Sequence, residues 1–311
     1  PVVTRTAILL MGPTASGKTD FAVSLCKRFP CDIISVDSAM VYRGMDIGTA
    51  KPDAETLKRA PHRLIDIRDP EDSYSAGDFV RDANEEMQHS FNAGRVPLLV
   101  GGTMMYFRAL TAGIAELPVA DADIRQQIDA RAAAMGWPAL HAELCDVDPP
   151  AGERINPNDS QRIQRALEVY LSSGKPLTEW QQQGAAATAS INHVKIALQV
   201  EPRVVLHARI AERLQKMVAS GFIEEVAGLR LRPGLRADSP AMRAVGYRQF
   251  WKHLDGDWTL AEAQDRALFA TRQLAKRQLT WLRSEQSIVP VDALEADAIG
   301  TISTILARHL D

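Results

Sequence analysis

GPTASGKT, residues 12 to 19, is the stretch of sequence that decides the fold. It fits the pattern G-x-x-x-x-G-K-[ST], in which the backbone N–H groups of a glycine-rich turn surround a phosphate. The preceding residues 6–11, TAILLM, predict a buried strand, and the spacing of Phe21, Leu25 and Cys26 predicts a helix afterwards. A strand, a glycine loop and a helix in this order direct the helix N-terminus at an anion.

The loop therefore predicts a site for a di- or triphosphate rather than a glycine turn with a surface lysine. Lys18 adds a positive charge, and the hydroxyl of Thr19 can reach Mg²⁺. The residues expected to hold the phosphates are Gly12, Thr14, Ala15, Ser16, Gly17, Lys18 and Thr19.

The rest of the chain predicts an α/β fold, a P-loop NTPase-like parallel sheet flanked by helices, with an inserted all-helical subdomain. Helical or turn-rich segments separate short apolar runs, which is typical of parallel sheets; the runs are residues 32–36, 64–67, 96–100, 194–200 and 288–291. Residues 118–190 differ, because amphipathic helices are expected at 123–135 and 160–171 and no strand is evident. We expect a core domain of residues 1–117 and 191–311, an insert of residues 118–190, and a return linker in residues 181–190.

Composition limits the function classes. The 311 residues are 46% hydrophobic and 24% charged, as in an ordinary globular protein. A net charge of −3 gives no overall attraction to nucleic acid, so any RNA site must be local. Three cysteines without a CxxC pair favour neither a disulfide framework nor a zinc site. The apolar runs are too short for a bilayer and no signal peptide is evident, so we expect a cytoplasmic protein with no membrane partner. We also expect a monomer.

The identity of the phosphate compound is a separate question. Triphosphatases of this fold usually hold Mg²⁺ with an acidic residue at the end of a buried strand. The run 96–100 ends instead in Gly101, Gly102 and Thr103. An acid follows the second strand, as Asp37, and would lie near the loop if that strand neighbours the first. The pattern disfavours ATP hydrolysis but leaves a P-loop nucleoside or metabolite kinase open.

Several motifs together resemble the bacterial tRNA dimethylallyltransferases, and they cover nearly the whole chain. They are GPTASGKT, ISVDSAMVYRGMDIGTAKP at 34–52, LVGGTMMY at 99–106, DSQRIQRALE at 159–168, RAVGYRQ at 243–249 and KRQLTWLR at 276–283. The resemblance implies transfer of a dimethylallyl group from dimethylallyl diphosphate to N6 of the adenosine 3′ to the anticodon, with release of diphosphate. The implied substrates are tRNAs that read codons starting with U, and the implied cofactor is Mg²⁺.

The resemblance also implies roles for individual residues. Asp37 would accept the proton of the adenine amine; the alternatives are a structural cap or a Mg²⁺ ligand acting through water. Thr103 would contact the bridging oxygen of the diphosphate, although a strand-ending turn also explains it. Arg213 would clamp the diphosphate, although arginines four apart, here Arg209 and Arg213, often form only a solvated helix face. Thr19, alone or with Asp37, would bind the metal.

Local basic surfaces are the candidates for tRNA binding. Arg272, Lys276, Thr280 and Arg283 fall on one line of a helix with no acid between its two arginines, although an ordinary basic surface has the same pattern. The residues expected to contact tRNA are Asp37, Ser38, Ala39, Met40, Thr103, Arg125, Gln161, Arg162, Ile163, Gln164, Arg165, Arg243, Gly246, Tyr247, Arg248, Lys276, Arg277, Gln278, Trp281 and Arg283. Met40 departs from the family, where many members have glutamine, and this puts a side-chain hydrogen bond there in doubt.

Two other functions remain open in addition to a kinase. A non-catalytic RNA-binding protein could use the loop as an anion site. A relative that prenylates free adenine nucleotides, an adenylate isopentenyltransferase, would share the loop, but a small acceptor needs neither the insert nor basic C-terminal helices.

Overall fold

A computed structural model describes residues 5–112, 117–118, 121–184 and 191–310. The chain forms two compact units. One consists of Pro1–Phe107 with Ser190–Asp311, and the other of Arg108–Ala189. Each unit is built around its own set of buried side chains.

The larger unit is built on a six-stranded sheet in which every pairing is parallel. The strands are β1 (Arg5–Met11), β2 (Cys31–Val36), β3 (His62–Arg63), β4 (Val96–Gly101), β5 (Ile191–Gln199) and β6 (Ile288–Asp292), in the order β3-β2-β4-β1-β5-β6. The predicted parallel α/β fold is confirmed. Because all strands run the same way, the segments that follow β1, β2 and β4 meet at one edge of the sheet.

Two details of the sheet differ from expectation. The strand predicted over residues 64–67 is wrong, because β3 ends at Arg63 and both Leu64 and Asp66 have left-handed backbones, with φ of 62° and 55°. Leu64 is nevertheless buried, so its apolar side chain packs without belonging to a strand. The second strand does not pair with the first, because β4 lies between β1 and β2.

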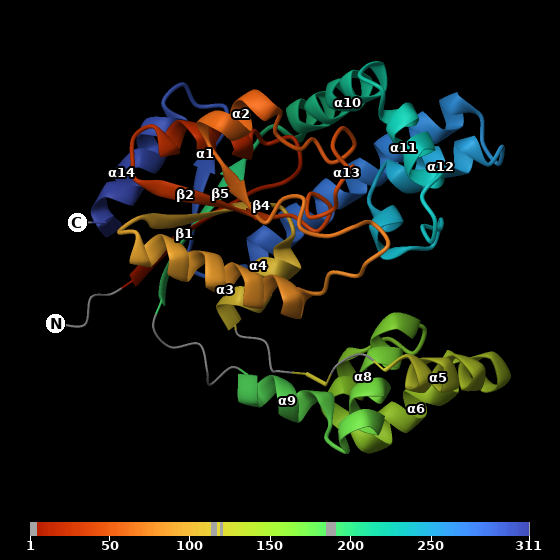
Figure 1. Cartoon of the computed structure of the whole chain (residues 1–311). Helices are drawn as coiled ribbons and strands as arrows, with labels where there is room; N and C mark the ends of the chain where they lie inside the picture. Colours follow the sequence, from red (N-terminus) through yellow and green to blue (C-terminus); the bar gives the residue numbers. More distant parts are fainter. Residues whose placement is uncertain (1–4, 113–116, 119–120, 185–190, 311) are drawn as a thin grey trace. The chain divides into compact units, whose positions relative to one another are not determined.

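Helices cover both faces of the sheet (Figure 1). The helix α3 (Ala76–Asn92) packs on β2 and β4 from one side, whereas α1 (Lys18–Cys26) and α14 (Ala298–Leu310) lie on the other. Alternating residues of the strands, such as Ile8 and Leu10, are fully buried against α1 and α14. The remaining helices near the sheet are α2 (Ala54–Arg59) and α4 (Met104–Ala112).

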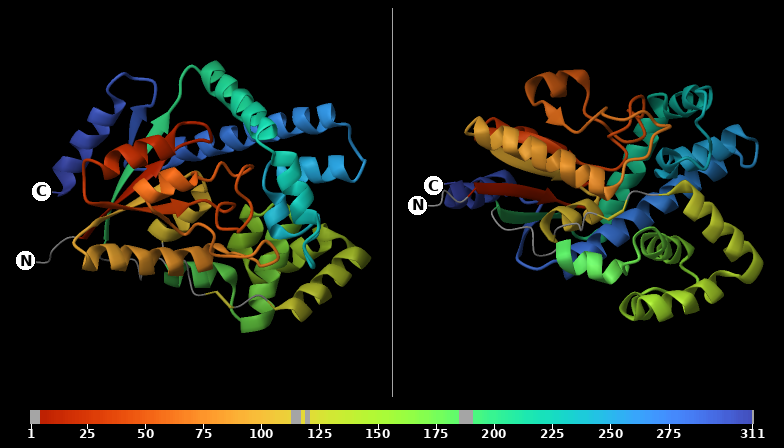
Figure 2. Two further views of the ribbon diagram at one scale, coloured as in Figure 1. Left: turned by 45° about the horizontal axis from the view of Figure 1, so that its top comes forward. Right: turned by 60° about the horizontal axis from the view of Figure 1, so that its bottom comes forward.

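A second group of helices extends beyond the sheet edge (Figure 2). It contains α10 (Arg203–Ala219), α11 (Phe222–Arg230), the 3-10 turn η2 (Pro240–Arg243), α12 (Tyr247–Leu254) and α13 (Leu260–Ser284). The helices α10 and α13 pack together through Leu206, Ile210 and Ala275, and Ala15 of the glycine loop packs against the same cluster. The loop therefore has α10 and α13 as neighbours as well as its own strand and helix.

Helices are the secondary structure of the smaller unit within its described residues. Its helices are α5 (Ala122–Met135), α6 (Trp137–Val147), α7 (Pro149–Arg154), α8 (Ser160–Ser173) and α9 (Leu177–Gly184). Ile128, Leu140, Leu144 and Leu167 are fully buried between them. The predicted linker overlaps the end of α9, and its residues 185–190 lie outside the described part of the chain. None of the described helices is long and apolar enough to cross a bilayer.

Candidate active site

The glycine loop has the geometry of an anion cradle. Ala15 and Gly17 have φ of 63° and 87°, so the loop turns sharply before α1 begins at Lys18. Gly12 has no room for a side chain, because a Cβ there would lie 2.8 Å from the Ser16 hydroxyl. Left-handed residues just before a helix turn successive N–H groups toward one point, which favours a phosphate.

Lys18 lies within this loop. Its ammonium donates to the carbonyl oxygens of Gly12 at 2.9 Å and Pro13 at 2.6 Å. Burial and, to a smaller extent, the charge of Arg213 lower the pKa of Lys18, the charge of Asp37 opposes them, and together they bring it to about 7. An anion would remove the cost of holding this charge in the loop.

Asp37 and Thr103 lie side by side because β2 and β4 are neighbours. Asp37 follows β2, and its Oδ1 accepts the N–H groups of Ala39 at 2.8 Å and Met40 at 3.1 Å. Thr103 follows β4, and its hydroxyl oxygen accepts the Ser38 N–H at 3.0 Å. Oδ1 of Asp37 therefore caps the turn that follows β2, which is the structural role considered above as an alternative. Oδ2 of Asp37 forms no hydrogen bond within the residues that the structure describes.

Arg213 completes the charged cluster from α10. Burial lowers the pKa of its guanidinium, and the charge of Asp37 opposes that shift. Arg213 also acts on Lys18, so three charges from β2, α1 and α10 influence one another across the loop. Two cations and one carboxylate leave a net positive charge, which suits a phosphate ligand.

Gln278 was expected to contact tRNA, but it is not on the protein surface. Its side chain is buried, and its Oε1 accepts the Thr14 N–H at 2.9 Å. Its Nε2 donates to the Gly102 carbonyl at 2.9 Å. The stripe of Ala275, Gln278 and Leu282 on α13 is the signal that could have located it, because the two flanking residues are buried as well.

Glu225 was not found by sequence reasoning. Its carboxylate accepts the backbone N–H groups of Asp46, Ile47 and Gly48 at 3.0, 2.7 and 3.2 Å. The Tyr247 hydroxyl donates to the same carboxylate at 2.5 Å. No local sequence pattern predicts that a carboxylate will accept hydrogen bonds from the backbone of a loop 177 to 179 residues away.

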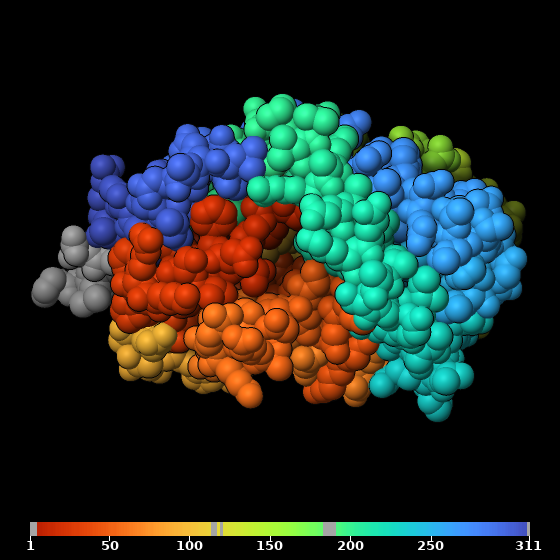
Figure 3. All heavy atoms as spheres, turned by 90° about the horizontal axis from the view of Figure 1, so that it is seen from above, coloured from red at the N-terminus to blue at the C-terminus, as the bar shows by residue number. Residues whose placement is uncertain are grey.

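The hydrogen bonds of Glu225 hold the loop of the DIGTAKP motif, residues 46–52, against α11 and α12. Figure 3 shows a hollow between the N-terminal part of the chain, in red and orange, and the green-blue segment of α10 and α11. Gly246 and Tyr247, both predicted tRNA contacts, are instead buried behind the Glu225 loop contact.

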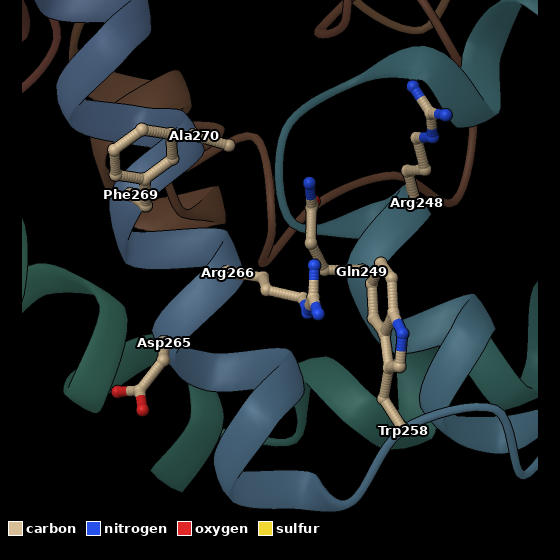
Figure 4. Close-up of a pocket in the computed structure, with 7 residues that line it drawn as sticks. All are labelled: Arg248, Gln249, Trp258, Asp265, Arg266, Phe269 and Ala270. Atoms are coloured by element: carbon tan, nitrogen blue, oxygen red, sulfur yellow. The ribbon is translucent and has the colours of Figure 1, made fainter.

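Other predicted tRNA residues in the larger unit are accessible. Arg243, Arg248, Lys276, Arg277 and Arg283 are exposed, and Trp281 is half-buried. A pocket of about 510 Å³ lies beside Arg248 (Figure 4). It is lined by Arg248, Gln249, Trp258, Asp265, Arg266, Phe269 and Ala270. The Arg266 guanidinium lies 4.4 Å from the centre of a Trp258 ring, and Phe269 is 65% exposed.

The predicted contacts in the helical unit fall into two groups. Gln161 and Arg162 are exposed, whereas Ile163 is fully buried in the core of the unit, so its side chain is not part of a surface. The buried carboxylate of Glu168 accepts hydrogen bonds from Arg125 at 2.9 Å and Arg165 at 2.8 Å. Gln164 donates to Asp129 at 2.6 Å. Glu168 thus holds two of the predicted arginines in fixed positions.

No group of three or more His, Cys, Asp or Glu side chains that could hold a metal occurs in the described part of the chain. Thr19 is half-buried at the start of α1, and Asp37 has its Oδ2 available. Two oxygen ligands do not form a protein cage, but they fit a Mg²⁺ ion that keeps waters and binds mainly through substrate phosphates.

Comparisons with known proteins identify the family of the chain. The family model described as IPP transferase matches residues 40–285. The chain is 52% identical to tRNA dimethylallyltransferase 2 of Hahella chejuensis, with 98% of this chain and 96% of that protein covered. It is 54% identical to the tRNA dimethylallyltransferase of Thioalkalivibrio sulfidiphilus, with 98% and 95% covered.

Solved structures give the same result. The fold matches the tRNA isopentenylpyrophosphate transferase of Bacillus halodurans with a TM-score of 0.73 and 38% identity, covering 98% of this chain and 97% of that one. It also matches a eukaryotic dimethylallyltransferase solved acting on tRNA, with a TM-score of 0.83, 22% identity, and 98% and 78% covered; that likeness shows the fold alone. The family resemblance noted in the sequence is confirmed.

Proposed function

This chain belongs to the IPP transferase family, and we propose that it transfers a dimethylallyl group from dimethylallyl diphosphate to tRNA. The acceptor is N6 of the adenosine 3′ to the anticodon, in tRNAs that read codons starting with U. The observation that carries the proposal is the convergence of Lys18, Asp37 and Arg213 beside the glycine loop. This cluster offers cations for a leaving diphosphate and a carboxylate for the incoming amine.

The first half of the reaction is departure of the diphosphate. The bond between C1 of the allylic group and the bridging oxygen breaks, and negative charge develops on the diphosphate. The loop N–H groups, Lys18 and Arg213 stabilise that charge where it forms, and positioned donors of this kind are each worth about 10²- to 10³-fold in rate. Thr103 contacts the bridging oxygen from the end of β4.

The second half is attack by the adenine amine. As the N6–C1 bond forms, the amine loses a proton, which Oδ2 of Asp37 accepts. Oδ1 is held by the N–H groups of Ala39 and Met40, so the carboxylate has a fixed orientation. A positioned general base of this type contributes about 10²- to 10⁴-fold. The adenine must leave its stack to reach Asp37, as in other enzymes that modify bases.

Mg²⁺ fits this site as a cofactor held by the Thr19 hydroxyl, with or without Asp37, and by the substrate. When bound, it neutralises charge on the diphosphate oxygens. Lys18 and Arg213 hold the same diphosphate from the protein side, so the metal adds to a binding site that the chain already forms.

The tRNA partner requires a surface larger than the cluster. Lys276, Arg277 and Arg283 offer cations for phosphates, and the pocket beside Arg248 combines a guanidinium with an exposed aromatic ring (Figure 4). In the helical unit, Gln161 and Arg162 with the oriented Arg125 and Arg165 supply further donors. We propose that the protein acts on tRNA in the cytoplasm and that it does so as a monomer.

One assay separates this function from its rivals. The protein is supplied with dimethylallyl diphosphate, Mg²⁺ and either unmodified tRNA or AMP, and the added prenyl mass and ATP consumption are both measured. Prenylated tRNA with AMP unchanged is the expected result. Prenylation of AMP in preference to tRNA would indicate an adenylate isopentenyltransferase, ATP consumption without prenylation a kinase, and tRNA binding without either a non-catalytic protein; each would overturn the proposal.

A further inference from the structure

Gln278, in the C-terminal part of the chain, joins two parts of the active site that come from the N-terminal part. Thr14 belongs to the diphosphate loop, and Gly102 immediately precedes Thr103. The Gln278 amide binds both backbones, at 2.9 Å each, from a helix that begins at Leu260. No other side chain in the described part of the chain bonds to both segments.

The bridge is buried and sterically tight. Gln278 is 7% exposed, so its amide depends on these two partners for its hydrogen bonds. A Cβ at residue 102 would lie 2.5 Å from the Gln278 Nε2, so the bridge requires glycine at that position. The bond also occupies the Thr14 N–H, which leaves the Thr14 hydroxyl for a phosphate.

We propose that Gln278 is a positioning residue for the prenyl transfer, which rests on the function proposed above. By holding Thr14 and Gly102 at a fixed separation, it sets the distance between the diphosphate and Thr103. Its immediate neighbours Lys276 and Arg277 point to solvent, so α13 presents a basic surface on one side and supports the diphosphate loop on the other. A misplacement of about 1 Å between reacting groups costs about 100-fold in rate.

The first test is Gln278→Met, which keeps the volume of the side chain and removes both hydrogen bonds. We expect kcat/KM for dimethylallyl diphosphate to fall about 10- to 100-fold, with tRNA affinity within about threefold of wild type. The matched control is Gln273→Met on the same helix, which should keep wild-type kinetics. Thermal unfolding of both variants separates a folding defect from a kinetic one.

The second test is Gln278→Glu, whose ionised carboxylate can accept from Thr14 but cannot donate to Gly102. A protonated glutamic acid restores that donor, and burial raises the pKa of such a group. The ratio of kcat/KM for Gln278→Glu to that of wild type should therefore rise as the pH falls. A role in packing alone would give a ratio independent of pH.

The outcomes are distinct. Loss of tRNA affinity with unchanged kinetics toward the diphosphate would assign Gln278 to the tRNA surface and overturn the proposal. Wild-type kinetics in Gln278→Met would also overturn it. Failure of wild-type protein to prenylate any tRNA would instead reject the proposed function, and the Gln278 proposal with it.

Discussion

Lys18 at the start of α1 lies within reach of the charge of Arg213 on α10, and burial, with a smaller effect of this charge, brings the pKa of Lys18 down to about 7. Two cations that disfavour each other across a glycine loop are stabilised by an anion between them. The consequence is a site that gains a proton when its ligand binds.

Proton uptake on diphosphate binding follows from this pair. Above pH 7 the free protein holds Lys18 mostly neutral, and a bound diphosphate raises its pKa, so binding takes up a proton and weakens as the pH rises from about 7 toward 10. Calorimetry with inorganic diphosphate at pH 8, in buffers of different ionisation enthalpy, measures that uptake. Lys18→Arg does not titrate in this range, so we expect wild type to take up nearly one proton more than this variant. Equal uptake by the two proteins would contradict the prediction.

Removal of the Arg213 charge should affect the leaving group. Arg213→Ala removes one cation from the developing diphosphate, and we expect kcat/KM for dimethylallyl diphosphate to fall about 10²- to 10³-fold. The loss of a like charge should also raise the pKa of Lys18 in the free protein and reduce the proton uptake. Arg209→Ala, one helical turn earlier on α10, is the control and should retain activity within about threefold. Similar losses in both variants would mean that Arg213 belongs only to a charged helix face.

Glu225 should contribute to stability rather than to chemistry. Its carboxylate satisfies three backbone N–H groups and the Tyr247 hydroxyl. Glu225→Gln replaces one acceptor oxygen with a donor that faces other donors, so we expect the free energy of unfolding to fall by about 2 kcal/mol. Urea denaturation measures this loss. The control is Glu224→Gln at the exposed neighbouring position, which should change the free energy of unfolding by less than about 0.5 kcal/mol. Equal losses in the two variants would show that the hydrogen bonds of Glu225 to the loop do not stabilise the fold.

The basic surface should act through phosphates. We expect Lys276→Ala and Arg248→Ala each to weaken tRNA binding and to reduce the slope of log affinity against log salt by about 0.7 to 0.9. The KM for dimethylallyl diphosphate should not change. Lys58→Ala, at an exposed position on α2, should leave the slope as in wild type. A salt slope unaffected by the first two changes would place the tRNA elsewhere.

The sequence predicts those parts of the site that depend on local patterns. The glycine loop follows from eight consecutive residues. The expectation for Asp37 depended on a pairing of β2 with β1, whereas the neighbour of β2 is β4, which brings Thr103 beside the residues that follow β2. Leu64 is the counterexample, because its apolar run predicts a strand that two residues with left-handed backbones, Leu64 and Asp66, break.

Long-range contacts are what the sequence does not predict. Gln278 lies in a basic segment, and only the fold shows that its amide turns toward Thr14, 264 residues away, rather than toward solvent. Ile163 and Tyr247 lie in polar motifs yet are buried, because each helix must place one side against a core. A helix that binds a ligand on one face and packs on the other has a motif in which both kinds of residue are mixed.

The central claim is that Asp37 accepts the proton of the attacking amine, and Asp37→Asn tests it most directly. The substitution keeps an oxygen for the N–H groups of Ala39 and Met40 and removes the basic carboxylate. Single-turnover prenylation of tRNA with bound dimethylallyl diphosphate should slow about 10²- to 10⁴-fold, with tRNA affinity nearly unchanged. A single-turnover rate equal to that of wild type would contradict the account.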